Sequence, residues 1–453
     1  MKLPRFAAFF IIALSLIGTL IFTSNNTIWI TLICAAVMTF AVTILVIYEK
    51  PAMFFTAVFF VNYVMFIEGG HFSGWILLGL LLLISPVFLF LKKPVRIFPM
   101  LLPFCLLSFY YVLVLLLKPY AINTSWFTMH LQAVIILALT QFFSWNAEKI
   151  ADVSKLHMLA LVIYGIIEVT LFYQERIRGP MLSSTAYAIM LVTVWATWFS
   201  YELLKTKPRY ISAVIYTILS TAIMIATGTR MAIIGIVITF ALILFIRNFI
   251  INQDAANKKL LKFGAWGIAA ALLVVTGWTL LPQDLLLKQN FEPLLRGEID
   301  LSSLGRIFAW ICGIHAFQES PLMGIGNGNF LQFVQQNYGH LPFPDFFLTI
   351  PHAHNATLVI LSENGIIGMI VVSALVSIAL LQFFRYVKQQ NTPHTAYCLI
   401  IGFAVMYILS MLDAMPYYPS SMVWGAWFLG ALIRLPVEHR SRIPLVKQPT
   451  SGV

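Results

Sequence analysis

Charged residues are scarce in this chain of 453 residues, because only 10% are Asp, Glu, Lys or Arg while 60% are hydrophobic. A water-soluble protein of this length carries much more charge on its surface. The mean hydropathy of +0.90 agrees with a lipid-embedded chain. Since only helices and closed barrels satisfy their backbone inside a bilayer, long apolar runs of about 20 residues indicate transmembrane helices. The composition therefore predicts an all-α polytopic membrane protein.

Cysteine and acidic residues are also few. The four cysteines are scattered, so neither a disulfide framework nor a CxxC metal site is expected. The chain has 17 acidic and 28 basic residues, which gives a net charge of +11. The basic residues do not cluster on a soluble face, so we expect no nucleic-acid partner.

Apolar runs between polar breaks predict the transmembrane helices. Two of the runs are short, so we expect twelve to fourteen spans. The candidate spans are 6–23, 28–48, 52–67, 75–92, 97–117, 127–145, 156–173, 183–203, 210–228, 232–251, 263–281, 356–384, 396–415 and 420–435.

The distribution of Lys and Arg predicts the orientation of these spans. With the N-terminus inside, 21 of the 28 basic residues fall on the cytoplasmic side and 7 on the outer side. Because Lys and Arg are retained in cytoplasmic loops, both termini are expected in the cytoplasm. The chain then divides into an N-terminal transmembrane bundle (1–281), one large outer loop (282–354), C-terminal transmembrane helices (355–435) and a cytoplasmic tail (436–453).

The outer loop is expected to contain an amphipathic helix around residues 307–317, with Ile307, Trp310, Ile311, Ile314 and Phe317 at helical spacing. Such a helix suits the membrane surface. Pro321 is expected to end it. The Gly-rich stretch 324–330 follows, and it lacks the Lys-Ser/Thr that a nucleotide-binding loop requires.

Two arginines stand out on the outer side. Arg230 lies in a short hairpin, Thr227 to Met231, and Arg306 lies just before the amphipathic stretch. Basic residues are disfavoured on this side, and two planar guanidinium groups suit a diphosphate. The alternative interpretation is contact with lipid headgroups or with the end of a helix.

His354 also allows two interpretations. A neutral imidazole at the outer surface is able to take a proton from a hydroxyl group, and His352 offers the same chemistry. The alternative is structural, since Asn355 is a favourable cap for the helix that follows.

Three acidic residues lie within or at the ends of the expected spans, where a charge is costly without a partner. Glu168, Glu363 and Asp413 are each expected to bind an arginine or a backbone group, and Asp413 is the best placed to reach Arg230 or Arg306. Asp300, near Glu298 in the loop, is expected to be solvated.

A longer pattern resembles a known family. His354-Asn355, nine residues and then Gly365-Ile366-Ile367-Gly368 is similar to the His-Asn-x9-Gly-x-x-Gly signature of the O-antigen ligase and O-antigen polymerase superfamily. The resemblance extends over about residues 170–420. It includes the stretches 176–179, 227–230, 304–310 and 321–326, which resemble arginine-containing and Gly-rich segments of that superfamily.

This resemblance implies a GT-C-like glycosyltransferase of the bacterial inner membrane that faces the periplasm and needs no metal or other cofactor. Its donor would be a glycan on undecaprenyl diphosphate, its acceptor the lipid A–core, and its surroundings membrane lipids. By resemblance, Arg230 and Arg306 would hold the diphosphate, with Arg176 and Arg178 as weaker candidates. His354 would be the general base of an inverting transfer, and His352 is the alternative base.

Other functions remain open at this stage. A ligase is favoured over a polymerase, because polymerases often carry two sizeable outer loops and this chain is expected to have one. Protein O-oligosaccharyltransferases are usually longer. A lipid-linked glycan transporter would place its charges near the membrane midplane and on both faces. A non-catalytic subunit would not need Arg230, Arg306 and His354 together.

Overall fold

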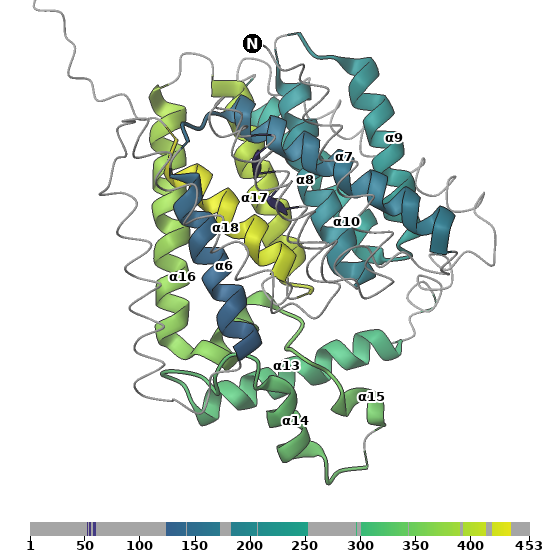
Figure 1. Cartoon of the computed structure of the whole chain (residues 1–453), viewed down its shortest axis with the longest axis vertical. Helices are drawn as coiled ribbons and strands as arrows, with labels where there is room; N and C mark the ends of the chain where they lie inside the picture. Colours follow the sequence, from purple (N-terminus) through teal and green to yellow (C-terminus); the bar gives the residue numbers. More distant parts are fainter. Residues whose placement is uncertain are drawn as a thin grey trace, which may run out of the picture.

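The computed structural model describes five residues between Ala52 and Phe59, then residues 124–141, 143–172, 183–205, 207–251, 296, 300–342, 344–389, 393–413 and 419–435. All regular secondary structure in these residues is helical (Figure 1). The spans expected at 6–23, 28–48, 75–92, 97–117 and 263–281, and most of 52–67, lie outside them. The total number of spans therefore stays a prediction.

Eight of the expected spans correspond to helices. Three of these helices are long and apolar enough to cross a membrane, namely α7, α8 and α16, and shorter apolar helices accompany them. The helices are α6 (Thr124–Thr140), α7 (Ala147–Phe172), α8 (Ser184–Leu204), α9 (Tyr210–Ala226), α10 (Arg230–Phe245) with the π-helix η4 (Ile246–Ile251), α16 (Ala356–Gln389), α17 (Tyr397–Ser410) after the 3₁₀ turn η6 (Pro393–Ala396), and α18 (Pro419–Ile433).

α7 begins earlier than its expected start at 156. Asn146 caps it, because the Asn146 side-chain oxygen accepts a hydrogen bond from the Lys149 N–H at 2.8 Å. The polar stretch 147–155 then continues into the apolar run as a single helix.

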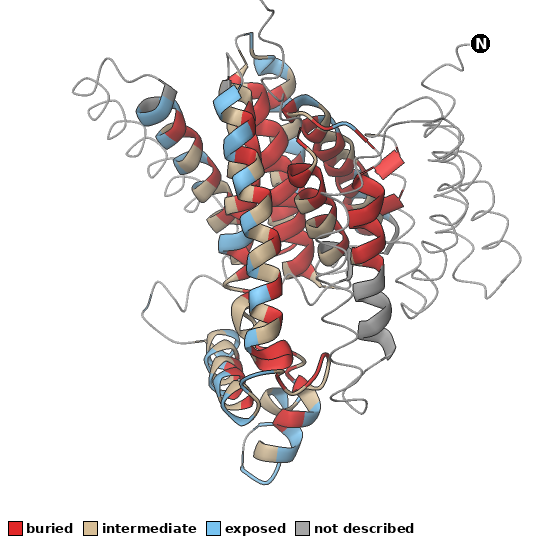
Figure 2. Ribbon diagram, turned by 90° about the vertical axis from the view of Figure 1, so that its left-hand side faces the viewer, coloured by how far each residue is buried: buried red, intermediate tan, exposed pale blue. Residues whose placement is uncertain are grey.

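α8 is the central helix of the bundle. Almost all its side chains are buried, and it packs against α7, α9, α10 and α17. Small residues allow close contact: a Cβ at Gly402 of α17 would lie 2.0 Å from Thr197 Oγ1 of α8. Side chains such as Ile218 of α9 and Ile370 of α16 are exposed, and the outer side of α16 is clearly exposed in Figure 2. Exposed apolar side chains on such helices suit contact with lipid.

Residues 300–354, called the loop segment below, lie at one end of the bundle (Figure 1). They form α13 (Leu301–Glu319), α14 (Phe330–Tyr338) and the single turn α15 (Asp345–Leu348). α13 is longer than the expected 307–317 and ends before Pro321, as predicted. α14 was not predicted from the sequence, although Phe330, Phe333 and Val334 are spaced as one buried helical face.

α13 has two different apolar faces. Its buried face consists of small residues, namely Gly305, Ala309, Cys312, Gly313 and Ala316. Its opposite face carries larger exposed side chains, namely Leu304, Ile307, Ile311 and Ile314. The small residues allow the chain before α16 to approach closely, because a Cβ at Gly313 would lie 3.0 Å from the Cβ of Ala353.

The Gly-rich stretch of the loop segment crosses α16 where that helix is broken. Gly365 interrupts α16 with φ 64° and ψ −164°. A Cβ at Gly365 would lie 2.4 Å from the carbonyl carbon of Leu322, and a Cβ at Gly324 would lie 2.2 Å from that of Glu363. Neither position has room for a side chain, so both glycines serve a contact between two stretches of backbone.

Hydrogen bonds on both sides of the break hold this crossing. The Ile325 N–H donates to the Ser362 carbonyl at 2.8 Å, and the Ile366 N–H donates to the Pro321 carbonyl at 2.8 Å. The side-chain Oε2 atom of Glu363 accepts a hydrogen bond from the Gly328 N–H at 3.0 Å. The expectation that Glu363 binds a backbone group is therefore confirmed. The Gly-rich stretch is fixed to α16, which places the loop segment relative to the bundle.

Candidate active site

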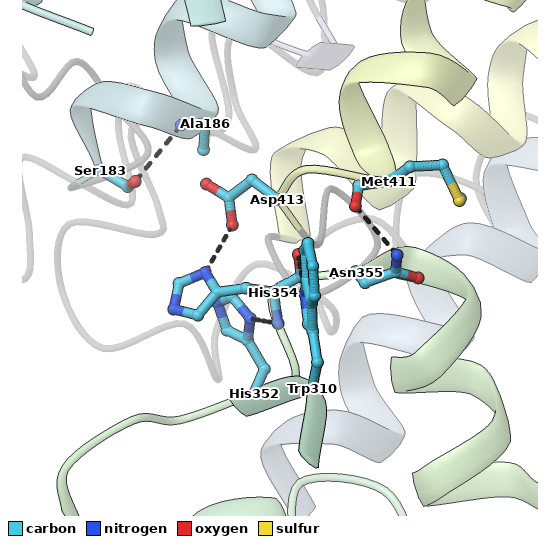
Figure 3. Close-up of polar contacts among 8 residues, drawn as sticks. All are labelled: Ser183, Ala186, Trp310, His352, His354, Asn355, Met411 and Asp413. Carbon is cyan, nitrogen blue, oxygen red and sulfur yellow. Dashed lines mark hydrogen bonds and ion pairs between the residues drawn. The ribbon is translucent and has the colours of Figure 1, made fainter. Parts of the chain in front are cut away.

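His354 and Asp413 meet at the end of the bundle that carries the loop segment. His354 precedes the first turn of α16, and Asp413 follows the last turn of α17. The His354 Nδ1 atom lies 3.0 Å from Asp413 Oδ1 (Figure 3). Asp413 is buried, whereas His354 is partly exposed. One side of the imidazole is thus held by a carboxylate.

Asp413 remains ionised in this position. Burial by itself would raise the pKa of Asp413, but the hydrogen bond from His354 and the nearby positive charges, including Arg306, together lower that pKa below its usual value. A carboxylate accepts hydrogen bonds, so His354 Nδ1 carries the proton and donates it. The lone pair of His354 is then on Nε2, where it is able to accept a proton.

Asn355 connects the same two helix ends. Its side-chain oxygen accepts a hydrogen bond from the Leu358 N–H at 3.1 Å, and its amide nitrogen donates to the Met411 carbonyl at 2.9 Å. It therefore caps α16 and ties the start of α16 to the end of α17. This is the structural role that the sequence offered for Asn355.

His352 lies deeper than His354. It is buried, and its Nδ1 atom accepts a hydrogen bond from the His354 N–H at 3.1 Å. Burial, with a smaller effect of His354, lowers the pKa of His352 to about 3. The ring is therefore neutral, and the lone pair on its Nδ1 atom is already used.

His352, His354 and Asp413 also have the spacing of a metal site, since one potential ligand atom from each lies within 4.8 Å of the others. In this arrangement the Nδ1 atoms of both histidines already take part in hydrogen bonds. An ion coordinated by those atoms would replace both bonds. The geometry is that of a base oriented by a carboxylate.

Arg230 is the first residue of α10. It follows a turn in which Gly228 has φ 64° and the hydroxyl groups of Thr227 and Thr229 lie 3.2 Å apart. Its Nη2 atom forms an ion pair with Oδ2 of Asp300. The expectation that Asp300 is solvated is wrong, because this side chain is 18% exposed and pairs with Arg230.

Asp300 also begins α13. Its Oδ1 atom accepts a hydrogen bond from the Ser303 N–H at 2.8 Å, which makes Asp300 the N-cap. An Asp directly before an apolar helical pattern is a typical start signal, so the cap was detectable from the sequence. The pairing with Arg230, seventy positions away in the chain, was not.

Arg306 lies in the second turn of α13. Its positive charge helps to lower the pKa of both Arg230 and Asp413, so these three groups belong to one electrostatic neighbourhood. The buried Nε atom of Arg306 has no hydrogen-bond partner among the described residues. A buried N–H donor without a partner is costly and favours an anionic ligand at this position. Arg176 and Arg178 lie outside the described residues.

Trp310, one turn after Arg306, was expected only as part of the apolar stripe of α13. Its indole N–H instead donates to the His354 carbonyl at 3.4 Å (Figure 3). The loop segment thus contributes Arg306, Trp310, His352 and His354, and the bundle contributes Arg230 and Asp413. Together they define an integral membrane protein with a basic site beside a His–Asp pair at one end of its helices.

The comparison with protein families agrees with this class. Residues 215–373 match the model of the family Wzy_C, which is described as O-antigen ligase. The matched range includes Arg230, Arg306 and His354, while Asp413 lies beyond it. Members of the family are O-antigen ligase- or polymerase-type enzymes that transfer lipid-linked glycans. No curated protein matched the chain.

Proposed function

We propose that this protein transfers an O-antigen glycan from undecaprenyl diphosphate to the lipid A–core at the periplasmic face of the bacterial inner membrane. The observation that carries the proposal is the hydrogen bond from His354 to Asp413, which leaves His354 Nε2 to accept a proton. The positive charge of Arg306, whose buried Nε has no hydrogen-bond partner among the described residues, acts on the same Asp413. The family match supports the same kind of reaction.

In the proposed reaction, a hydroxyl oxygen of the acceptor sugar attacks the anomeric carbon of the donor. The bond from that carbon to the diphosphate oxygen breaks as the new glycosidic bond forms, and the configuration inverts. The hydroxyl proton passes to His354 Nε2. Asp413 stabilises the resulting imidazolium and keeps the ring in the required tautomer.

The leaving diphosphate is stabilised by the two arginines. Arg230 and Arg306 present fixed positive charge, and the free Nε of Arg306 adds a donor for a phosphate oxygen. Fixed cations meet the charge that develops on the leaving group, so the reaction as proposed needs no metal. Arg176 and Arg178 are secondary candidates for the same anion site.

The proposed topology places this end of the bundle in the periplasm and both termini in the cytoplasm. It rests on the excess of Lys and Arg in the loops at the opposite end. The helix starts at Arg230 and Ala356 and the helix end at Ser410 would then face the periplasm, as a lipid-linked donor requires.

The lipopolysaccharide profile of a deletion strain tests the function. Loss of polymer from the core with accumulation of lipid-linked polymer supports a ligase, whereas core that bears one repeat unit indicates a polymerase. Complementation with His354→Ala is expected to fail although the protein inserts. His340→Ala is the matched control, since His340 is an exposed histidine of the loop segment. Normal banding with His354→Ala would remove His354 from the mechanism.

A further inference from the structure

We propose that His352 is a positioning residue, which fixes the backbone of His354 through its side-chain nitrogen and does not itself exchange the substrate proton. The inference rests on the proposed role of His354 as the base. It gives His352, in the stretch Pro351-His352-Ala353-His354, a defined function. That function is a hydrogen bond to the backbone of His354.

The backbone of His354 is strained. Its φ angle is 46°, and among the described residues it is the one non-glycine residue with a positive φ. This conformation is unfavourable for an L-residue with a Cβ. It persists only where surrounding contacts determine it. The contacts that hold His354 are therefore part of how the imidazole is aimed.

A different group holds each part of His354. Its N–H donates to His352 Nδ1 at 3.1 Å, its carbonyl accepts from Trp310 Nε1 at 3.4 Å, and its ring bonds to Asp413. The next residue, Asn355, caps α16. The ring direction depends on the backbone angle, so loss of the N–H contact would turn the imidazole away from Asp413.

His352 acts here as an Asx-type cap does. Its Nδ1 atom stands two bonds from Cβ and accepts the N–H of the residue two positions later, which is the bond that an Asn or Asp oxygen makes in an Asx turn. Asn at this position is able to make the same bond. Gln has one more methylene group and places its oxygen too far along the side chain.

The surroundings of His352 support this role. The residue is 1% exposed and the following Ala353 is fully buried against the small face of α13. A general base needs a free lone pair that reaches the substrate hydroxyl. The Nδ1 lone pair of His352 accepts the His354 N–H, and burial, which lowers the pKa of His352, keeps its ring neutral.

The matched variants His352→Asn and His352→Gln separate the two roles, because both side chains are neutral amides that cannot act as a base. Initial transfer rates are measured in membranes with lipid-linked glycan as donor. We expect His352→Asn to retain kcat within about threefold of the wild type. We expect His352→Gln to lose about tenfold or more in kcat with an unchanged donor KM, because small displacements of a catalytic group are costly. Equal inactivity of Asn and Gln, or full activity of Gln, overturns the inference.

Two further variants complete the test. Trp310→Phe removes the donor to the His354 carbonyl and is expected to lower kcat at constant donor KM. A wild-type kcat in Trp310→Phe would show that the backbone contacts of His354 do not orient its ring. This result is informative even where a His352 variant folds poorly. His354→Ala distinguishes a failure of the proposed function from a failure of the positioning role of His352. Activity in His354→Ala refutes the proposed function, whereas an inactive His354→Ala with equal His352→Asn and His352→Gln rates refutes the positioning role alone.

Discussion

The helix bundle and the loop segment are held together by different interactions. In the bundle, α8 is buried by apolar neighbours, and contacts such as Gly402 against Thr197 allow helices to approach closely. The loop segment instead depends on hydrogen bonds to helix ends, including Ile366 to Pro321 and Asn355 to Met411. Packing fixes the distances between helices, while the polar contacts fix the orientation of the functional groups.

The candidate site lies where these two regions meet. His354 of the loop segment pairs with Asp413 of the bundle, and Asp300 of the loop segment pairs with Arg230 of the bundle. Each pair takes one partner from each region. We therefore expect changes at the pairs to alter the transfer reaction, and changes in the interior of the bundle to alter stability.

The largest effect is expected for Asp413→Asn, which removes the charge that orients His354 and stabilises its protonated form. The rate should fall by about 10²–10⁴-fold, the usual contribution of an oriented general base. Because the pKa of Asp413 lies below its usual value, the carboxylate stays charged as the pH falls, and the difference from the variant should persist at pH 5. Asp345→Asn is the control, since Asp345 is exposed in the same loop segment. Equal rates for Asp413→Asn and the wild type would rule out the pair as the base.

Arg306→Lys is expected to have the next largest effect, although the charge is kept. A lysine cannot replace the planar fork or its buried Nε donor, so kcat/KM for the lipid-linked donor should fall about tenfold to a hundredfold. Arg296→Lys, in an exposed turn before the loop segment, should behave as the wild type. Full activity of Arg306→Lys would show that only its charge matters.

The sequence predicted much of the bundle, because lipid imposes apolar runs that show directly in the chain. The runs at 183–203 and 210–228 match α8 and α9 to within a few residues. Pro321 as the end of the amphipathic helix also followed from a local rule. These features depend on residues close together in the sequence.

The features that the sequence did not predict depend on contacts between distant residues. The bond from Trp310 to His354 and the pairing of Asp300 with Arg230 need the folded arrangement of helix ends. Gly324 and Gly365 are plain in the sequence, but no local pattern shows that Gly324 makes room for the backbone of Glu363 and Gly365 for that of Leu322. The same holds for the His352 nitrogen, whose partner depends on the φ angle of His354.

In the bundle, Gly402→Ala should reduce stability and leave the catalytic parameters of the folded protein unchanged. The new Cβ would meet Thr197 Oγ1, and such overpacking costs about 1–3 kcal/mol. Thermal unfolding in detergent measures the loss. The double variant with Thr197→Ala should recover much of it, since the colliding side chain is shortened. A changed donor KM in folded Gly402→Ala would contradict the separation of the two regions.

The pH dependence of stability offers a test in the loop segment. His352 has a pKa of about 3 in the folded protein, below the value of 6.5 for a free histidine. Between these values the unfolded chain binds a proton that the folded chain does not, so stability falls as the pH is lowered from 6.5 towards 3. From pH 7 to pH 5 this single group should cost about 2 kcal/mol. His352→Asn should lose less stability over that range than the wild type, and an identical loss would argue against a neutral buried His352.

The smallest effect is expected at Asp300, where one side chain serves both regions. Its Oδ1 atom caps α13 and its Oδ2 atom pairs with Arg230. Asp300→Ala should lose both contacts and about 1 kcal/mol of stability, whereas Asp300→Asn keeps an oxygen for the cap and loses only the charge. A diphosphate must compete with the Asp300 carboxylate for Arg230, so Asp300→Asn should lower the donor KM by about two- to fivefold, the usual strength of a partly exposed ion pair. A higher donor KM in Asp300→Asn would mean that the carboxylate holds Arg230 in the orientation that binds donor, and that the contact between the two regions serves binding and not only the placement of α13.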